Sequence, residues 1–226
     1  MRIVAWPCPA PGGTGEEFAI VAVPPASAAR VLIVPALFEE ANRTRRMLVE
    51  TMRALAKSGI ASVLPDLAGC NESLAPLDAQ DLAGWRAAMV AATDHFAATH
   101  VFSLRGGALV APVNLPGWRF EPIAGAQVLR PVLRARTVAA RDESRSETMD
   151  GLLEHGRDVG IELAGYRLGA AMVRDLTAAA LPESVAQALL TLDELGGSAL
   201  WLRSEPGDDS DMSAALSARV VADLTS

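Results

Sequence analysis

Cysteine, histidine, lysine and aromatic residues are all scarce in this chain of 226 residues. The two cysteines, Cys8 and Cys70, lie far apart without metal-ligand spacing, so neither a metal site nor a cofactor is expected and both should be reduced thiols. Aromatic residues make up only 4% of the chain, while alanine is common. We therefore expect helices that pack closely through small side chains.

Two other absences limit the partners and the compartment. The net charge is −7 and no block of basic residues occurs, which argues against nucleic acid as a partner. No segment approaches the ~18 apolar residues of a membrane span, and the apolar run in Met1–Pro7 is too short for a signal peptide. We expect a cytoplasmic protein without a membrane span, formed by one domain over residues 1–226.

Along the chain, sequence patterns typical of strands alternate with patterns typical of helices. The first half predicts an edge hairpin, three buried strands and two intervening helices. The predicted segments are a hairpin of Arg2–Trp6 and Glu17–Val23, strands at Val31–Pro35, Ala61–Pro65 and His100–Leu104, a helix N-capped by Asn42, and a helix over Asp81–Thr99. This alternation is typical of an α/β protein with a mostly parallel sheet.

The second half continues the pattern with shorter elements. The predicted elements are a strand at Trp118–Pro122, helices at Gly125–Arg141, Ala170–Ala180 and Pro182–Leu192, a last edge strand at Ala199–Leu202, and a terminal helix at Met212–Leu224. Four arginines recur along Gly125–Arg141, and they indicate either a solvated face or a site for an anionic partner.

The joint Ser103-Leu104-Arg105-Gly106-Gly107 links a buried strand to a sharp turn. Small residues two before and two after the central position let strand and helix pass close together, as in the G-x-S-x-G nucleophile elbow. The central position here holds Arg105. A guanidinium stays protonated in proteins and cannot act as a nucleophile. The joint therefore predicts the shape of a hydrolase without its usual serine.

Several segments resemble one family. The run from Pro35 to Met47, with Glu-Glu-Ala-Asn-Arg-Thr-Arg-Arg-Met, resembles the signature of exosortase A system-associated hydrolases of the second type. Leu64–Ser73 resembles that family's strand-four loop, a variant of P-D-x-x-G-x-G-x-S. Leu104–Leu109 resembles its altered elbow, where arginine also occupies the serine position. Trp118–Ala139 and Ala164–Tyr166 extend the likeness over most of the chain.

The resemblance implies an α/β-hydrolase fold, with a mostly parallel twisted sheet, helices on both faces and a shortened C-terminal part. It also implies a bacterial protein encoded beside exopolysaccharide and protein-sorting machinery. The chain departs from a complete hydrolase, because a catalytic triad needs a histidine after the last strands. His95, His100 and His155 are the only histidines, and none follows His155. No Ser-His-Asp triad is recognisable.

Arg105 is the centre of the expected ligand site. It would meet either a carboxylate or phosphate of a ligand, or an internal partner, Glu39 or Glu40. The two glutamates have a second interpretation as an acid–base pair. The candidate ligand-binding residues are Arg105, Gly106, Phe38, Glu39, Glu40 and Asn42.

We expect a protein with a degenerate active site that binds an acyl, glycosyl or peptide-derived ligand, or a protein of the exopolysaccharide system. The alternative is an active esterase or thioesterase with a different nucleophile, Ser103 or Cys70. Against that alternative, Ser103 suits close packing in the strand and Cys70 suits a structural thiol. A third interpretation is a purely structural partner in an assembly.

Overall fold

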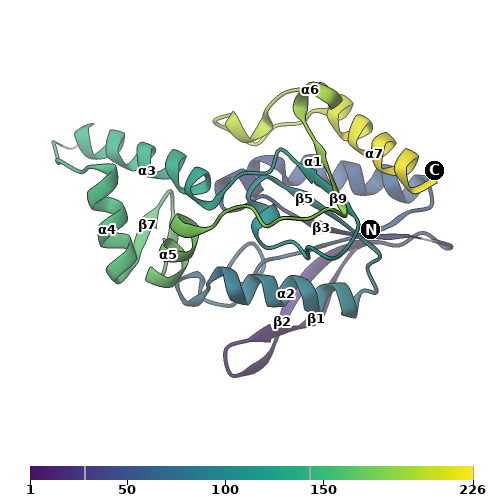
Figure 1. The fold of residues 1–226 in the computed structure, drawn as a ribbon, viewed down its shortest axis with the longest axis horizontal. Coiled ribbons are helices and arrows are strands. Elements are labelled where there is room, and N and C mark those ends of the chain that lie inside the picture. The colour runs from purple at the N-terminus through teal and green to yellow at the C-terminus, as the bar shows by residue number, and fades with distance from the viewer. Residues whose placement is uncertain (28, 143, 226) are drawn as a thin grey trace.

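The computed structural model describes residues 1–27, 29–142 and 144–225. Within these residues seven strands form one sheet in the order β1-β2-β4-β3-β5-β6-β9, and β7 and β8 form a separate hairpin (Figure 1). The strands are β1 (Arg2–Ala10), β2 (Gly13–Ala22), β3 (Arg30–Val34), β4 (Ala61–Pro65), β5 (His100–Leu104), β6 (Gly117–Phe120), β7 (Ile161–Leu163), β8 (Tyr166–Leu168) and β9 (Gln187–Leu190).

The sheet is parallel except at one edge. Strands β4, β3, β5, β6 and β9 pair in parallel, whereas β1 and β2 form an antiparallel hairpin that joins the sheet through β4. The apolar strands β3, β4 and β5 are buried along nearly their whole length, as expected for strands covered on both faces. The predicted α/β architecture with an edge hairpin is confirmed.

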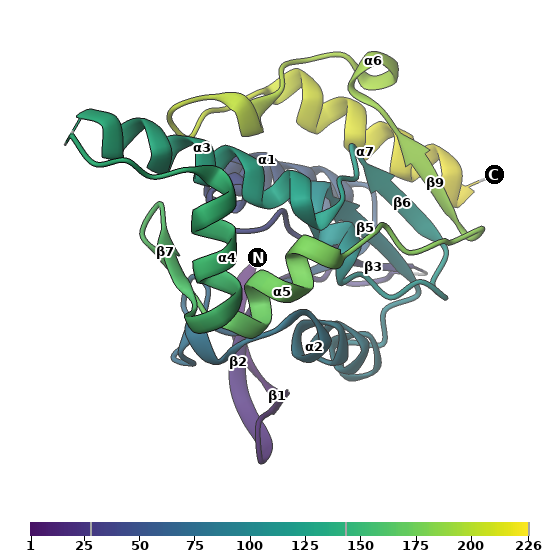
Figure 2. The same cartoon turned by 60° about the vertical axis from the view of Figure 1, so that its left-hand side comes forward.

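Helices cover both faces of the sheet (Figures 1 and 2). Helices α1 and α7 pack together on one face, and α2 covers the other face beside β1. Helices α3, α4 and α5 with the β7–β8 hairpin form a lobe beyond the ends of the parallel strands. The helices are α1 (Glu39–Lys57), α2 (Leu82–His95), α3 (Gly125–Asp142), α4 (Met149–Val159), α5 (Ala170–Ala178), α6 (Leu192–Leu195) and α7 (Ser210–Thr225), and short 3₁₀ segments are η1 (Leu77–Ala79), η2 (Arg105–Leu109) and η3 (Leu200–Leu202).

Three local predictions were wrong. The first long helix begins at Glu39 with Phe38 at the N-cap, so Asn42 lies inside its first turn instead of capping it. The segment Pro182–Leu192, predicted as a helix, contains strand β9. A short apolar run of this kind is compatible with a helix or a strand, and here it forms a strand because it pairs with β6.

The predicted edge strand at Ala199–Leu202 is also wrong, because this segment forms the 3₁₀ turn η3. Two glycines with positive φ, Gly196 and Gly197, turn the chain just before it. The turn places the Trp201 ring against Phe120, with ring centroids 5.8 Å apart. The C-terminal segment therefore covers the end of the sheet instead of widening it.

Among the described residues, none of the helices combines the length and the apolar character needed to cross a membrane.

Candidate functional site

The connections of the sheet direct attention to the ends of β3 and β5. Strand β3 has β4 on one side and β5 on the other, so the direction of chain progression reverses between β3 and β5. Open α/β sheets bind ligands at such a switch point, outside the carboxyl ends of the strands. Two turns begin there, Pro35–Phe38 after β3 and the turn at Arg105 after β5.

The turn at Arg105 has the strained geometry expected from the sequence. Arg105 has φ 52°, in the left-handed region that a non-glycine residue seldom adopts. Gly107 must lack a side chain, because a Cβ there would lie 2.2 Å from the carbonyl oxygen of Pro35. The chain continues from the turn into the five-residue 3₁₀ helix η2 and not into an α-helix.

The Arg105 side chain is held by an internal ion pair. Its Nε lies 3.1 Å from Glu40 Oε2 and its Nη2 lies 3.2 Å from Glu40 Oε1, a two-pronged contact. Its Nη1 donates to the carbonyl oxygen of Glu121 at 3.3 Å, and its guanidinium lies 4.7 Å from the centre of the Trp201 ring. The expected internal partner is therefore present, and it is Glu40.

Glu39 has a different partner from its neighbour. Its carboxylate lies 2.6 Å from Arg43 Nη2, and Arg43 also donates to the carbonyl oxygen of Trp201 at 2.8 Å. Each glutamate thus has its own arginine. This separation leaves no shared geometry for the two carboxylates to act as an acid–base pair.

The two fallback nucleophiles lack activation. Ser103 is fully buried in β5, and its hydroxyl lies 3.5 Å from the carbonyl oxygen of Trp118. Burial, together with the nearby carboxylates of Asp66 and Glu17, raises the pKa of the Cys70 thiol to about 12. A thiol with so high a pKa is almost entirely protonated near neutral pH, whereas only the thiolate is a reactive nucleophile.

The histidines lie elsewhere. His95 packs against Trp6 and Phe96 at the end of α2. His100 stacks on Trp118 at the start of β5, with Nδ1 2.9 Å from the Thr99 hydroxyl, and burial lowers its pKa. Among the described residues no histidine has a hydrogen bond or ring contact with Ser103, Cys70 or Arg105.

The loop after β4 is a structural unit. The Ser73 hydroxyl accepts the amide of Gly69 at 2.8 Å and donates to Glu17 Oε1 at 2.8 Å. The Asp66 carboxylate, buried at 3% exposure, accepts from Asn71 at 2.9 Å and pairs with Arg45 at 3.1 Å. Burial raises the pKa of both Glu17 and Asp66. These contacts give Ser73 and Asp66 structural roles in the loop.

Two small cavities flank Phe38. One of about 170 Å³, here called the Glu40 cavity, lies on the Arg105 side between the start of α1, helix α3 and η3. The other, of about 230 Å³, here called the Tyr166 cavity, lies between the loops after β3 and β4 and the β7–β8 hairpin. Phe38 lines both cavities and has φ 54°, a strained conformation for an aromatic residue.

The candidate residues are distributed over these two cavities. Glu39 and Glu40 line the Glu40 cavity, and Asn42 lines the Tyr166 cavity. Arg105 lies behind Glu40, and Gly106 is covered by Leu37 and Val128, whose side-chain atoms would lie 3.2 Å and 2.8 Å from a Cβ at that position. The sequence did not point to Trp201 or Tyr166 as site residues, although Tyr166 is the only tyrosine of the chain.

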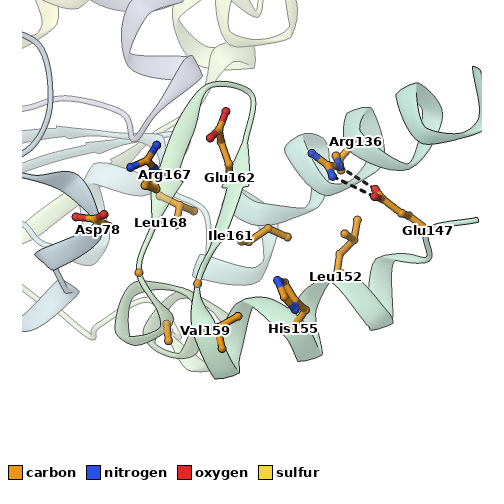
Figure 3. A pocket seen from close by; sticks show the side chains of 13 residues that line it. Asp78, Arg136, Glu147, Leu152, His155, Val159, Ile161, Glu162, Arg167 and Leu168 are labelled. Carbon is orange, nitrogen blue, oxygen red and sulfur yellow. Dashed lines mark hydrogen bonds and ion pairs between the residues drawn. The ribbon is translucent and has the colours of Figure 1, made fainter. Parts of the chain in front are cut away.

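A large open cleft lies in the lobe, away from Arg105. It has a volume of about 750 Å³ and runs between α3, α4 and the β7–β8 hairpin (Figure 3). His155 and Arg167 face this cleft, and the Arg136–Glu147 ion pair, 2.8 Å long, lies at its other end. Acidic and basic side chains alternate around it, so its charge favours no class of ligand. Across the described residues, no group of three or more His, Cys, Asp or Glu side chains could hold a metal ion.

Comparison with solved structures places this arrangement in a known fold. Est1E from Butyrivibrio proteoclasticus aligns over 98% of this chain and 97% of its own, with 10% identity and a TM-score of 0.54. The bottromycin epimerase BotH, solved with bottromycin A2, aligns over 97% and 99%, with 17% identity and a TM-score of 0.54. A protein from Agrobacterium vitis S4, provisionally described as a hydrolase, aligns over 78% and 71%, with 15% identity and a TM-score of 0.54.

The chain has the α/β-hydrolase fold. The predicted fold class is confirmed. At identities this low the likeness concerns the fold alone, because one fold carries many functions. No protein-family model matches the sequence, and no curated protein matches it.

Proposed function

We propose that this protein is a non-catalytic member of the α/β-hydrolase superfamily, a single domain that binds a ligand at the carboxyl end of β3, beside the switch point. Arg105 occupies the position of the nucleophile at the elbow. The observation that carries the proposal is the side chain of Arg105, which is only 13% exposed and is paired with Glu40. A guanidinium held in this way can neither attack an ester nor accept a proton.

The surroundings of Arg105 support the same conclusion. In α/β-hydrolases the oxyanion hole uses the amide after the nucleophile and an amide of the loop after β3. Here Leu37 and Val128 cover Gly106, which follows Arg105. The Arg105 guanidinium already neutralises the Glu40 carboxylate, so its charge is not available to a developing oxyanion. The epimerase BotH shares this fold, so the fold is compatible with functions other than hydrolysis.

Ester hydrolysis tests the proposal directly. Purified protein is expected to hydrolyse p-nitrophenyl acetate and butyrate no faster than its Ser103→Ala and Cys70→Ala variants. Arg105→Ser should remain inactive, because no histidine lies near the new hydroxyl to activate it. Turnover by the unmodified protein that disappears in one of the two single variants would establish an unusual esterase or thioesterase instead.

The cellular role that we propose is that of a cytoplasmic bacterial protein acting beside exopolysaccharide and protein-sorting machinery. The support is the resemblance of residues 35–47 and 104–109 to exosortase A system-associated hydrolases. Deletion of the coding sequence in its own bacterium is expected to change the amount of exported polysaccharide. An unchanged amount, with normal sorting of cell-surface proteins, would contradict this role.

A further inference from the structure

The two cavities beside Phe38 differ in charge. The Glu40 cavity contains Glu39, Glu40 and Arg43 in its wall. None of the described residues that line the Tyr166 cavity is charged. Its apolar wall consists of Pro35, Ala36, Phe38, Ala41 and Leu67. A charged ligand in the Tyr166 cavity would lose its hydration without gaining a counter-ion, which is costly.

Aromatic side chains hold the shape of the Tyr166 cavity. The Phe38 ring lies between two others, with its centroid 5.4 Å from that of Tyr166 and 5.8 Å from that of Trp85. The Trp85 indole is itself fixed, because its Nε1 donates to the carbonyl oxygen of Ala68 at 3.0 Å. The strained backbone at Phe38 is thus stabilised by packing on two sides. Rigid aromatic walls favour a flat apolar ligand.

The polar groups of the cavity offer hydrogen bonds without charge. The Asn42 amide nitrogen donates to the Tyr166 hydroxyl at 2.9 Å. Within the described residues this leaves the Tyr166 O–H as a donor and the Asn42 carbonyl as an acceptor with no protein partner. Burial keeps the Cys70 thiol protonated and raises the pKa of Tyr166. A ligand with one donor and one acceptor at the same end matches this pair.

The size of the cavity limits the ligand. An apolar cavity of about 150 Å³ is known to take a benzene molecule. The 230 Å³ here is larger than that and smaller than the pockets of drug-sized ligands. Cys70, Asn71 and Tyr166 also line an open cleft of about 570 Å³, so the cavity and this cleft share part of their walls.

We infer that the Tyr166 cavity binds a neutral, planar molecule of about ten non-hydrogen atoms with an amide-like end, such as an aromatic or short acyl amide. The ring or acyl chain lies against Phe38, and the amide end faces Tyr166 and Asn42. This inference rests on the proposed ligand-binding function and specifies its ligand. The charged residues around Arg105 stabilise the fold and do not contact the ligand.

The test uses the single tyrosine as its own reporter. Protein labelled with ¹³C on the tyrosine ring gives signals from Tyr166 alone. Benzamide is expected to shift these signals to saturation. Benzoate has the same size and shape but carries a charge, and it is expected to leave them unchanged. Equal or tighter binding of benzoate would overturn the inference, as would the absence of any shift with benzamide.

Matched variants locate the binding. Ala41→Leu places a larger side chain in the cavity and should abolish the shift, whereas Ala54→Leu, half-buried on the same helix but outside the lining, should retain it. If Ala41→Leu does not fold, Asn42→Ala, at an exposed position, serves instead. It should weaken the binding of benzamide about three- to tenfold, which is the effect expected from the loss of one hydrogen bond. Unchanged binding in these variants would overturn the inference.

The two proposals fail in different ways. Ester turnover that depends on Ser103 or Cys70 would refute the non-catalytic function, whatever benzamide does. Inert esters together with an unresponsive Tyr166 would refute only the assignment of the ligand.

Discussion

The two sides of Phe38 make opposite use of polar groups. On the Arg105 side, each charged group has a partner, and Trp201 covers the guanidinium. On the Tyr166 side, the described residues of the wall are uncharged, and among them the O–H hydrogen of Tyr166 and the side-chain carbonyl of Asn42 have no protein partner. Arg105, at the sharp turn after β5, is thus held by contacts within the protein. The space suited to a ligand lies one side chain away.

A substitution that forces the two turns apart should cause the largest loss of stability. Gly107→Ala would force a Cβ to within 2.2 Å of the Pro35 carbonyl, a backbone atom that cannot move aside. We expect a loss of about 3 kcal/mol or more in the free energy of unfolding, measured by urea denaturation. Gly106→Ala meets only side-chain atoms of Val128 and Leu37, so it should lose about 1 kcal/mol. Equal effects of the two variants would contradict the packing described for the turn.

Removal of the carboxylate that pairs with Arg105 should cause the second-largest loss of stability. Glu40→Gln leaves a largely buried guanidinium without its carboxylate, and we expect a loss of about 2 kcal/mol, between the values for exposed and buried pairs. The matched control is Glu39→Gln. Its carboxylate is 40% exposed, so the loss should stay below about 1 kcal/mol. The comparison would be broken if the control proved the more damaging of the two.

The buried carboxyl of Glu17 should make the stability of the protein depend on pH. Burial raises its pKa above the usual 4.5, so the folded state holds the proton more tightly than the unfolded state. Its contribution to stability therefore falls as pH rises from about 4.5 through the raised pKa. Glu17→Gln should flatten this part of the stability profile, measured by thermal unfolding at several pH values. A profile as steep as that of the unmodified protein would contradict this assignment.

The smallest effect is expected on the neutral side. Tyr166→Phe removes the hydroxyl that accepts from Asn42 but keeps the ring against Phe38. The loss should be about 0.5 to 1 kcal/mol, because the bond is near the surface. The same variant should weaken benzamide more clearly than it weakens the fold. A large loss of stability would mean that the hydroxyl serves the structure first.

Much of the fold could be predicted from the sequence, because buried strands and amphipathic helices have distinct periods. The need for a small residue at Gly107 was predicted from the elbow-like motif, whereas the positive φ at Arg105 was not predicted. Which glutamate pairs with Arg105 could not be predicted, since neighbouring residues on a helix differ in direction by about 100°. The role of Trp201 depends on the turn η3, which was predicted as a strand.

Tyr166 was also beyond local reasoning. It belongs to a three-residue strand 124 positions from Asn42 in the sequence, and only the folded lobe brings the two together. The chemistry of the Arg105 turn is local and could be anticipated. The Tyr166 cavity is formed by three segments distant in sequence, and it could not.

Reaction with a fluorophosphonate tests directly whether the protein has an activated serine. The reagent adds covalently to an activated serine hydroxyl, and intact-mass spectrometry detects one adduct per chain. An unchanged mass is expected for both the unmodified protein and Arg105→Ser, because in the part of the chain that the structure describes no histidine contacts the turn to activate a hydroxyl there. A stoichiometric adduct on the unmodified protein would contradict it.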